Sequence, residues 1–381
     1  MSHWRLSAWY FFYFAFVGAF APYFALYLQS LALSAWEISV LLSLMQLMRL
    51  LAPSLWGRLA ERCGSKICVV RLGALMSLPG FAGFYVADGF AALFACMAVM
   101  SFFWSAALPQ VEALTLAHLR PHAERYSAIR SWGSIGFIVA VLGVGALLDA
   151  FPVAAQLNVD ILLLLGVLAL ALVLVEAPGA GPGAPAQAVA EGSSRRSLYL
   201  LLAATLLMSA AHGPFYVFFS IHLVAHGYDK TLVGALWSLG VVAEILVFFV
   251  MPRLLRRYAL RSLLMFSFVC AVARFLAIGW GAASLPLMLL AQLLHGATFG
   301  VCHAAAVAAL HRWFPERQQG RVQALYSSVS FGAGGMLGGL AGGQVWQWWG
   351  AGASFSLGAL FAALGLLLLW RAWPREVLAQ R

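Results

Sequence analysis

The sequence predicts an all-α integral membrane protein in which twelve transmembrane helices form two six-helix bundles. Three observations lead to this fold class: the composition, the length of the apolar runs and the placement of the basic residues. Hydrophobic residues make up 63% of the 381 positions and charged residues only 9%. A water-soluble domain does not have this balance.

The apolar runs are long enough to cross a bilayer one after another. A helix needs about 20 apolar residues to span about 30 Å of hydrocarbon. The first run follows Arg5, contains Pro22 and has no small-residue cleavage site, so we expect a retained helix and not a signal peptide. The centres of the runs lie near residues 18, 47, 77, 101, 141, 166, 209, 241, 271, 297, 335 and 361.

The basic residues predict the orientation in the membrane. Of the 23 Lys and Arg residues, we place Lys230 in an outside loop and Arg49 and Arg274 deep in spans. The others lie in or beside alternate connections, which the positive-inside rule assigns to the cytoplasm. This accounts for the formal charge of +10 without a nucleic-acid partner. We expect a multi-pass protein of the bacterial cytoplasmic membrane with both termini in the cytoplasm.

The chain divides at a stretch rich in Pro, Gly and Ala, 177–197, which predicts a cytoplasmic linker between the bundles 1–176 and 198–381. The two halves resemble each other. Residues 34–41 align with 228–235, and residues 132–137 with 326–331, both at an offset of 194 positions. A constant offset indicates duplicated halves, and we expect a substrate site between them near the bilayer midplane.

A short charged segment, 57–66, separates the second and third apolar runs. Two glycines bracket a predicted tight turn, and Glu61 lies between basic residues. The segment resembles the loop between the second and third helices of major facilitator superfamily transporters, which implies a hairpin that latches one bundle to the other. We also predict a salt bridge across the next cytoplasmic turn. The predicted gating residues are Gly57, Glu61, Arg62, Gly64, Lys66, Glu112 and Arg130.

Other segments resemble one branch of this superfamily, the phenylpropionate permease family, which is related to lactose and nucleoside proton symporters. The likeness runs nearly end to end, and it implies a proton-coupled importer of a small aromatic carboxylate. The second half departs from the hairpin pattern, because 251–257 keeps the charge but lacks the glycines and the acid. The most specific segments are 22–24 with 26–28, Arg49 followed by Pro53 and Trp56-Gly57, 129–137, 236–244 and 294–303.

Several ionisable side chains fall inside predicted spans, where a charge costs about 2.5–3.5 kcal/mol on insertion scales. A titratable acid there suits ion coupling, and histidine, which titrates near neutral pH, could exchange protons with it. The competing interpretations are a permanent structural pair between Glu244 and Arg274, and histidines that are satisfied in the core. The predicted proton-coupling residues are Glu244, His295, Arg274 and His303.

A ring-bearing carboxylate requires an aromatic wall and a cation. The only deep cation of the first half is Arg49, whose planar guanidinium suits a carboxylate; an ion pair with Glu112 is the alternative. The aromatic stripe on the first helix could equally be core packing. The predicted substrate-binding residues are Arg49, Trp237, Tyr23, Tyr27, Trp104 and His212.

The remaining patterns point away from catalysis. The glycines follow no strand and precede no Lys-Ser or Lys-Thr pair, which argues against a nucleotide-driven pump. His118 and His122 have metal-like spacing, but Pro121 interrupts any helix there, and we find no nucleophile with a base. We therefore expect a monomer without metal or cofactor that is not an enzyme. The glycines around 334–343, and Gly133, Gly136 and Gly143, are predicted packing or sliding surfaces.

Two alternatives to carboxylate import stay open. One is a sugar or nucleoside proton symporter of the same architecture, which would need more polar groups in the cavity. The obvious amides are Gln46, Gln110 and Gln292. The other, from a different class, is an exporter of apolar compounds or a transport-dead membrane sensor.

Overall fold

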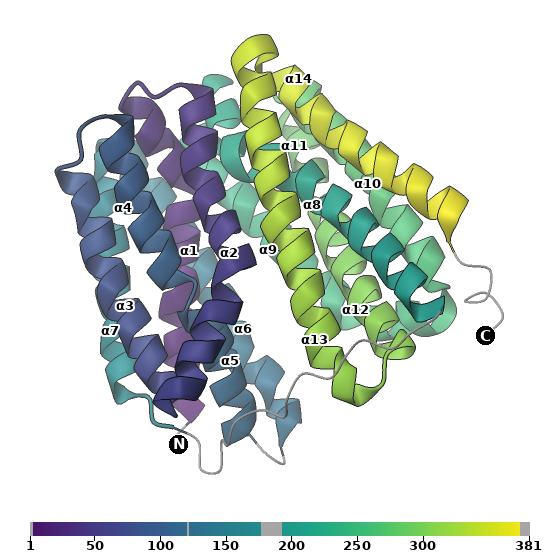
Figure 1. Ribbon diagram of the computed structural model, residues 1–381. Coiled ribbons are helices and arrows are strands. Elements are labelled where there is room, and N and C mark those ends of the chain that lie inside the picture. Colours follow the sequence, from purple (N-terminus) through teal and green to yellow (C-terminus); the bar gives the residue numbers. More distant parts are fainter. Residues whose placement is uncertain (1–2, 120–121, 177–192, 374–381) are drawn as a thin grey trace. The chain divides into compact units, whose positions relative to one another are not determined.

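The computed structural model describes residues 3–119, 122–176 and 193–373, and all regular secondary structure in these ranges is helical (Figure 1). The fold expected from the apolar runs is therefore confirmed. Contacts divide the chain into two compact units. The first contains Met1–Ala184 and Leu223–Ser238, and the second contains Pro185–His222 and Leu239–Arg381. Most of the predicted linker, 177–192, lies outside the described residues.

Seven long helices of the described chain lie in the first unit, and α1 packs against three of them, α2, α6 and α7. Large aromatic side chains fill the buried face of α1, because an unbroken apolar helix can be buried on several sides at once. The bounds are α1 (His3–Ser30), α2 (Ala35–Cys63), α3 (Lys66–Ala82), α4 (Gly89–Trp104), α5 (Ala107–His118), α6 (Tyr126–Ala150) and α7 (Gln156–Val173), with short turns η1 (Gly83–Tyr85), η2 (Ala123–Arg125) and η3 (Val153–Ala155).

The turn between α2 and α3 is shorter than the sequence suggested. Helix α2 continues through Cys63, so Gly57 lies inside a helix and does not begin a hairpin. Only Gly64 and Ser65 remain as the turn: Gly64 ends α2 with a φ of 65°, and the Ser65 hydroxyl caps α3. The tight turn predicted to start at Gly57 is wrong, because the residues after it form helix readily and a single left-handed glycine is enough to stop it.

The end of α7 is held by side chains from earlier in the sequence. Arg5, Arg71 and His118 donate hydrogen bonds to backbone carbonyls between residues 171 and 175. These carbonyls have no helical partner, and cations are favourable near a helix C-terminus. Directly afterwards, the Glu176 carboxylate accepts a 3.1 Å hydrogen bond from the Ile67 N–H in the first turn of α3.

Helix α10 is the packing centre of the second unit, where it contacts α11, α12, α14 and η4. Helix α9 begins in the first unit and continues in the second. The bounds are α8 (Ser193–Ala225), α9 (Lys230–Arg257), α10 (Leu260–Gly281), α11 (Leu285–His295), η4 (Gly296–Val301), α12 (Cys302–Trp313), α13 (Glu316–Ser327), η5 (Ser328–Gly334) and α14 (Gly335–Ala372). Both η4 and η5 are π-helical.

Ten helical stretches of the described chain are long and apolar enough to cross a membrane. Helix α2 adds one more when its two arms, which meet at an angle of 52°, count as a single span. The last stretch, Glu316–Ala372, turns at Gly350, where φ is 79°, and so contains two arms. These two features account for the difference from the twelve apolar runs.

Glycines bring particular helix pairs into backbone contact. A Cβ atom on Gly338 of α14 would collide with the Ala210 carbonyl of α8, and one on Gly136 of α6 would collide with the Phe11 carbonyl of α1. Close approach of this kind is what small residues permit in membrane helices. Each contact lies inside one unit. Gly143 differs from the packing role predicted for it, because a Cβ atom at this position would meet no described atom within 4 Å.

Candidate functional site

A cluster of polar side chains lies buried in the second unit, where five helical segments contribute one or two residues each. All of them come from stretches long and apolar enough to span a membrane. Three of the four predicted proton-coupling residues are in it. The members are His212 of α8, Glu244 of α9, Arg274 of α10, Gln292 and His295 of α11, and Thr298 of η4.

Arg274 is fully buried and bonds to neutral oxygens. Its Nε donates to the Ala291 carbonyl at 2.9 Å and its Nη1 to the Thr298 hydroxyl at 3.2 Å. The guanidinium carbon lies 4.3 Å from the centre of the Phe215 ring and 5.3 Å from that of Phe275, both cation–π distances. These contacts leave the proposed structural pair between Arg274 and the acid of α9 unsupported.

The acid of the cluster is beside a histidine. The Nε2 atom of His295 lies 3.8 Å from the Oε2 atom of Glu244, within ion-pair distance when the imidazole is protonated. Their side chains are 9% and 22% exposed, so both are largely shielded from water. A proton can pass between two such groups over a short path, and the charge of each depends on the other.

His212 is fixed from both ring nitrogens. Its Nδ1 donates to the Met208 carbonyl at 2.8 Å, which leaves Nε2 as an acceptor 3.3 Å from the Thr298 hydroxyl. The same hydroxyl accepts from Arg274. Thr298 therefore joins the histidine of α8 to the arginine of α10, and it was not identified from the sequence because a lone threonine in an apolar run gives no distinct signal.

The π-helical segment η4 aligns two histidines with a phenylalanine between them. The rings of His295 and Phe299 lie 5.7 Å apart and those of Phe299 and His303 lie 6.0 Å apart, each pair within 14° of parallel. His303 also contacts the Tyr326 hydroxyl at 3.0 Å through Nδ1. A regular α-helix would have offset the two histidines by about 80°. The wider π turn removes much of that offset.

Several polar atoms in the cluster are buried and have no hydrogen-bond partner among the described residues. They are Nη2 of Arg274, both the nitrogen and the oxygen of the Gln292 amide, and Nδ1 of His295. Gln292 is fully buried. Unpaired buried polar groups are costly, so an arrangement of several together is typical of a site that receives a polar group.

The other predicted substrate-binding residues lie in the first unit and have different surroundings. Trp104 is buried and stacks on Tyr13 with ring centres 4.2 Å apart, and Trp237 is also buried. The Tyr27 hydroxyl donates to the Phe84 carbonyl at 3.2 Å. Arg49 is exposed. These residues and the polar cluster therefore belong to different units.

The predicted gating residues are partly assembled. Glu112 and Arg130 approach to 4.0 Å, the limit of an ion pair, and the guanidinium of Arg130 lies 3.9 Å from the centre of the Phe14 ring. Glu61 and Arg62 project from the exposed last turn of α2. The buried face of the same helix end carries Trp56, whose Nε1 donates to the Phe102 carbonyl.

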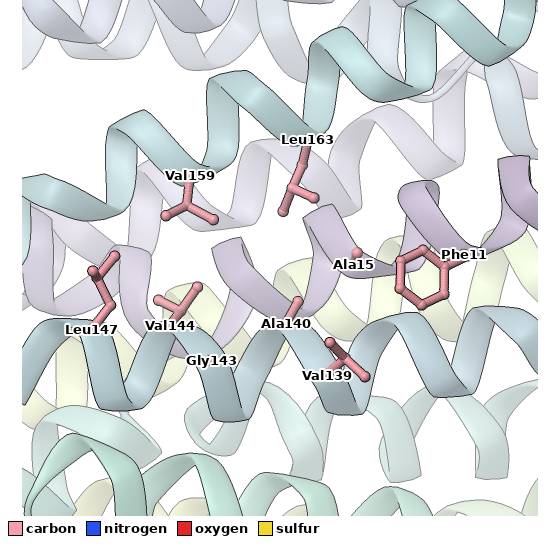
Figure 2. A pocket seen from close by; sticks show the side chains of 9 residues that line it. All are labelled: Phe11, Ala15, Val139, Ala140, Gly143, Val144, Leu147, Val159 and Leu163. Atoms are coloured by element: carbon pink, nitrogen blue, oxygen red, sulfur yellow. The ribbon is translucent and has the colours of Figure 1, made fainter.

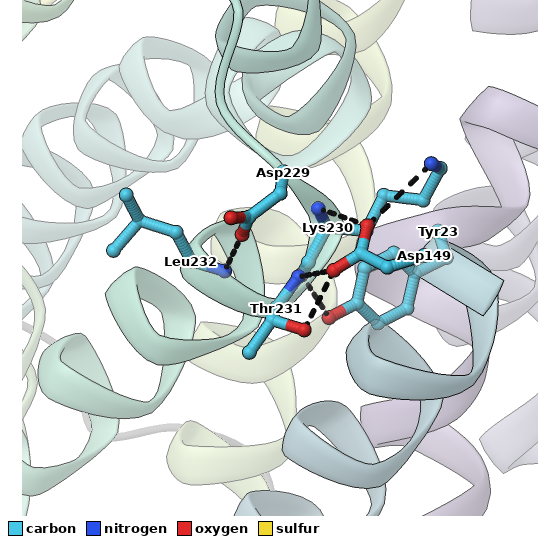
Figure 3. Close-up of polar contacts among 6 residues, drawn as sticks. All are labelled: Tyr23, Asp149, Asp229, Lys230, Thr231 and Leu232. Atoms are coloured by element: carbon cyan, nitrogen blue, oxygen red, sulfur yellow. Dashed lines mark hydrogen bonds and ion pairs between the residues drawn. The ribbon is translucent and has the colours of Figure 1, made fainter.

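A second polar group, missed by the sequence, joins the end of α6 to the start of α9 inside the first unit (Figure 3). The Asp149 carboxylate accepts from the backbone N–H groups of Lys230 and Thr231 at 2.8 and 2.9 Å and from the Thr231 hydroxyl at 2.6 Å. The Lys230 ammonium lies 3.6 Å away. Beside it, the Tyr23 hydroxyl donates to the Val141 carbonyl at 2.7 Å.

Two further features carry no site chemistry. Figure 2 shows an apolar pocket of ≈ 250 Å³ between α1, α6 and α7, lined only by hydrocarbon side chains and the open position Gly143. In the loop after α5, His122 lies 3.1 Å from Glu124. A hydrogen bond from the backbone of Glu124 and the contact with His122 lower the pKa of that carboxyl.

The comparison with known proteins agrees with this arrangement of helices. The sequence model of the MFS_1 like family, a group of major facilitator transporters, matches residues 3–357. The chain belongs to this family. The MFS transporter is 32% identical over 378 residues to the "Probable 3-phenylpropionic acid transporter" of Escherichia coli (strain K12), with 97% of both chains covered. It is 31% identical to the "Maltose permease" of Geobacillus stearothermophilus, with 96% of this chain and 92% of the relative covered.

Solved structures extend the likeness to three dimensions. The transporter matches a mutant of the nucleoside transporter NupG with a TM-score of 0.84 and 19% identity, covering 97% of this chain and 98% of the other. At this identity the match concerns the fold alone. The relatives of this transporter are not enzymes, and the multi-pass fold is that of a membrane transporter.

Proposed function

We propose that this MFS transporter imports a small aromatic monocarboxylate together with a proton, by alternating access, across the bacterial cytoplasmic membrane. One observation carries the coupling: Glu244 and His295 lie 3.8 Å apart and largely buried within the second unit. The similarity to a protein named as a 3-phenylpropionic acid transporter supports the substrate class. Both termini are cytoplasmic in this proposal, and the transporter works as a monomer.

The coupling step is a change of charge at Glu244. Outside, Glu244 takes up a proton, with His295 as its exchange partner. The neutral pair no longer opposes enclosure in a low-dielectric site, since a buried charge is costly and a buried carboxylic acid much less so. After the site opens to the cytoplasm, substrate and proton leave together. His303 is separated from His295 by Phe299, whose ring carries no exchangeable proton, so we centre the coupling on Glu244 and His295.

The remaining predicted residues are assigned to substrate binding and to gating. Arg49, Trp237 and His212 are proposed to contact substrate in other conformations, together with the aromatic side chains of the first unit. The Glu61 turn is proposed to release and reform as the cytoplasmic side opens and closes. The other predicted contact residues are Tyr23, Tyr27 and Trp104, and the other gating residues are Arg62, Gly64, Lys66, Glu112 and Arg130.

Sugar–proton symport is the second candidate, because a maltose permease is nearly as similar as the first relative. The two candidate substrates differ in the charge that they bring to the site. A sugar brings hydroxyl groups without charge, whereas a carboxylate brings a negative charge to a cluster that contains a buried guanidinium. Uptake of labelled 3-phenylpropionate and of labelled maltose into the same vesicles separates them.

The test of the coupling is Glu244→Gln in reconstituted vesicles. The amide mimics the protonated acid, so we expect accumulation of 3-phenylpropionate driven by a pH gradient to be lost. Exchange between preloaded vesicles should stay measurable, because the loaded carrier can still turn over. Glu124→Gln, which makes the same change in an exposed loop, is the matched control. Concentrative uptake that survives Glu244→Gln removes this residue from the mechanism.

A further inference from the structure

Arg274 is a buried cation whose hydrogen bonds all go to neutral oxygens. It is fully buried, and its contacts are the Ala291 carbonyl, the Thr298 hydroxyl and two aromatic rings. Among the described residues, no carboxylate lies within ion-pair distance of it. A guanidinium removed from water costs several kcal/mol unless an anion compensates it. Arg274 therefore has no negatively charged partner in the described chain, and the acid of the cluster, Glu244, lies beside His295 instead.

Hydrogen-bond donors of the polar cluster also have no acceptor. Nη2 of Arg274 carries two N–H groups without a partner in the described chain, and the amide nitrogen of Gln292 carries two more. Both residues belong to the same turn of contact between α10 and α11, because Arg274 bonds to the carbonyl of the residue directly before Gln292. Of these four unused N–H groups, two are on a cation without an anionic partner in the described chain, so the site calls for a ligand with oxygen acceptors and a negative charge.

Gln292 also borders the coupling pair. A Cβ atom built on Gly240 of α9 would lie 3.1 Å from the Gln292 Oε1 atom and 3.4 Å from the Cδ2 atom of His295. Glu244 is one helical turn further along the same face of α9. The amide oxygen thus faces α9 one helical turn from Glu244, and it belongs to α11, the same helix whose backbone accepts from Arg274.

We infer that Arg274 and Gln292 form the subsite that receives the carboxylate of the transported molecule. The inference rests on the proposed function, whose substrate class it explains at the level of atoms. A carboxylate supplies the missing charge and accepts from both unused donors, and the Phe215 ring over the guanidinium offers an apolar surface beside it. A water molecule would satisfy the donors and leave the charge uncompensated, and a sugar hydroxyl would do the same.

The inference makes Gln292→Leu an informative variant. Leucine has a similar volume and removes two unpaired buried atoms without leaving new ones, so we expect the ligand-free protein to fold and to melt at the same or a higher temperature. Binding should change in the opposite direction. Loss of one hydrogen bond to a charged ligand weakens binding by about tenfold or more.

The experiment compares purified wild type, Gln292→Leu, Arg274→Lys, Arg49→Lys and Arg256→Lys by ligand-induced shifts in melting temperature. The probes are 3-phenylpropionate and 3-phenylpropionamide, which differ only in the charged group. Wild type should bind the carboxylate more tightly than the amide. This preference should fall at least about tenfold in Gln292→Leu and Arg274→Lys, since lysine keeps the charge and loses the planar fork. Arg256→Lys, at an exposed arginine of α9 to which no role in binding is assigned, is the matched control and should keep the preference. Arg49→Lys tests the other arginine that is proposed to contact substrate.

Each outcome has one meaning. If wild type does not prefer the carboxylate, the proposed substrate class fails. If wild type prefers it and Gln292→Leu keeps the full preference, the subsite is overturned and the substrate class stands. The same holds when Arg49→Lys alone loses the preference. If Arg274→Lys does not fold, Gln292→Leu decides by itself.

Discussion

Asp149 joins two helices through a single carboxylate that accepts three hydrogen bonds, two of them from the first N–H groups of α9. An anion in this position accepts from unpaired backbone donors, and the positive end of the helix dipole stabilises its charge. At the residue scale, this one side chain connects the end of α6 to the start of α9. This contact could not be predicted from the sequence, in which Asp149 is one of several acids near the predicted outside loops.

We expect Asp149→Asn to loosen this contact by about 1–2 kcal/mol, less than a fully buried charged hydrogen bond because the carboxylate is partly exposed. Hydrogen exchange of the Lys230 and Thr231 amides should then become faster. Lys230→Gln removes only the ammonium at 3.6 Å and should have a smaller effect. Equal exchange rates in Asp149→Asn and wild type would show that the carboxylate does not hold the start of α9.

The sequence identified the ionisable members of the site and missed the neutral ones. Glu244, Arg274 and His295 stand out because charge in an apolar run is rare. Their partners could not be predicted, because Arg274 chooses a backbone carbonyl and Thr298, neither of which has a distinct pattern. Gln292 was visible as an amide, but its importance comes from its unpaired atoms, which only the packing of α9 against α11 reveals.

At the scale of single elements, the largest departure from expectation is the π-helical segment η4. A sequence read with the α-helical period places His295 and His303 on faces about 80° apart. The π turn inserts an extra residue and brings them into one stack with Phe299. Gly296 and Gly300 lie in this segment, but glycines also occur in the regular α-helices of this chain. Glycine content alone therefore does not distinguish a π-helical from an α-helical segment.

The glycines offer a comparison within one residue type. Gly338→Ala should lower the free energy of unfolding by about 1–3 kcal/mol, because the new methyl group meets the Ala210 carbonyl across α8 and α14. Gly143→Ala meets open space and should be neutral or stabilising by up to about 1 kcal/mol through helix propensity. Thermal unfolding of the two variants in the same detergent measures the difference. Equal destabilisation would contradict the packing role of Gly338.

The whole molecule must change conformation to transport, and we propose that the turn after α2 influences that change. Glu61 is exposed at the helix end, whereas the polar cluster is buried in the second unit. We expect Glu61→Ala to slow transport of 3-phenylpropionate without a matching loss of binding, because a group outside the site acts only on the equilibrium between states. Uptake rates and melting-temperature shifts on the same protein test this.

Arg62→Ala at the neighbouring exposed position shows whether the effect belongs to the acid or to the charge of the turn as a whole. A loss of binding as large as the loss of rate would make the turn structural. The first half contains this pattern and the second half does not, so the effect is expected from one side of the repeat only.

At the same scale, the sequence predicted the number and order of the spans well. Apolar runs report directly on burial in a membrane, and each run became a helix or one arm of a bent helix. The division of the chain into two units depends on contacts between helices, which the apolar runs do not report. Residues 223–238 belong with the first unit because Tyr23 and Asp149 bind there, and such contacts between distant parts of the chain leave no periodic trace in the sequence.

The contacts at the end of α7 also set an order of assembly during biosynthesis. Every partner of its final carbonyls, from Arg5 to His118, has been synthesised before α7 itself emerges. Asp149, by contrast, waits for an amide 81 residues later, and the Tyr23 hydroxyl is 207 residues from the Lys230 carbonyl that it also binds. Chains grow at about 5–20 residues per second and fold from the N-terminus. The contacts at the end of α7 can therefore form seconds before the start of α9 exists, and the first unit is complete only when the segment Leu223–Ser238 has been added.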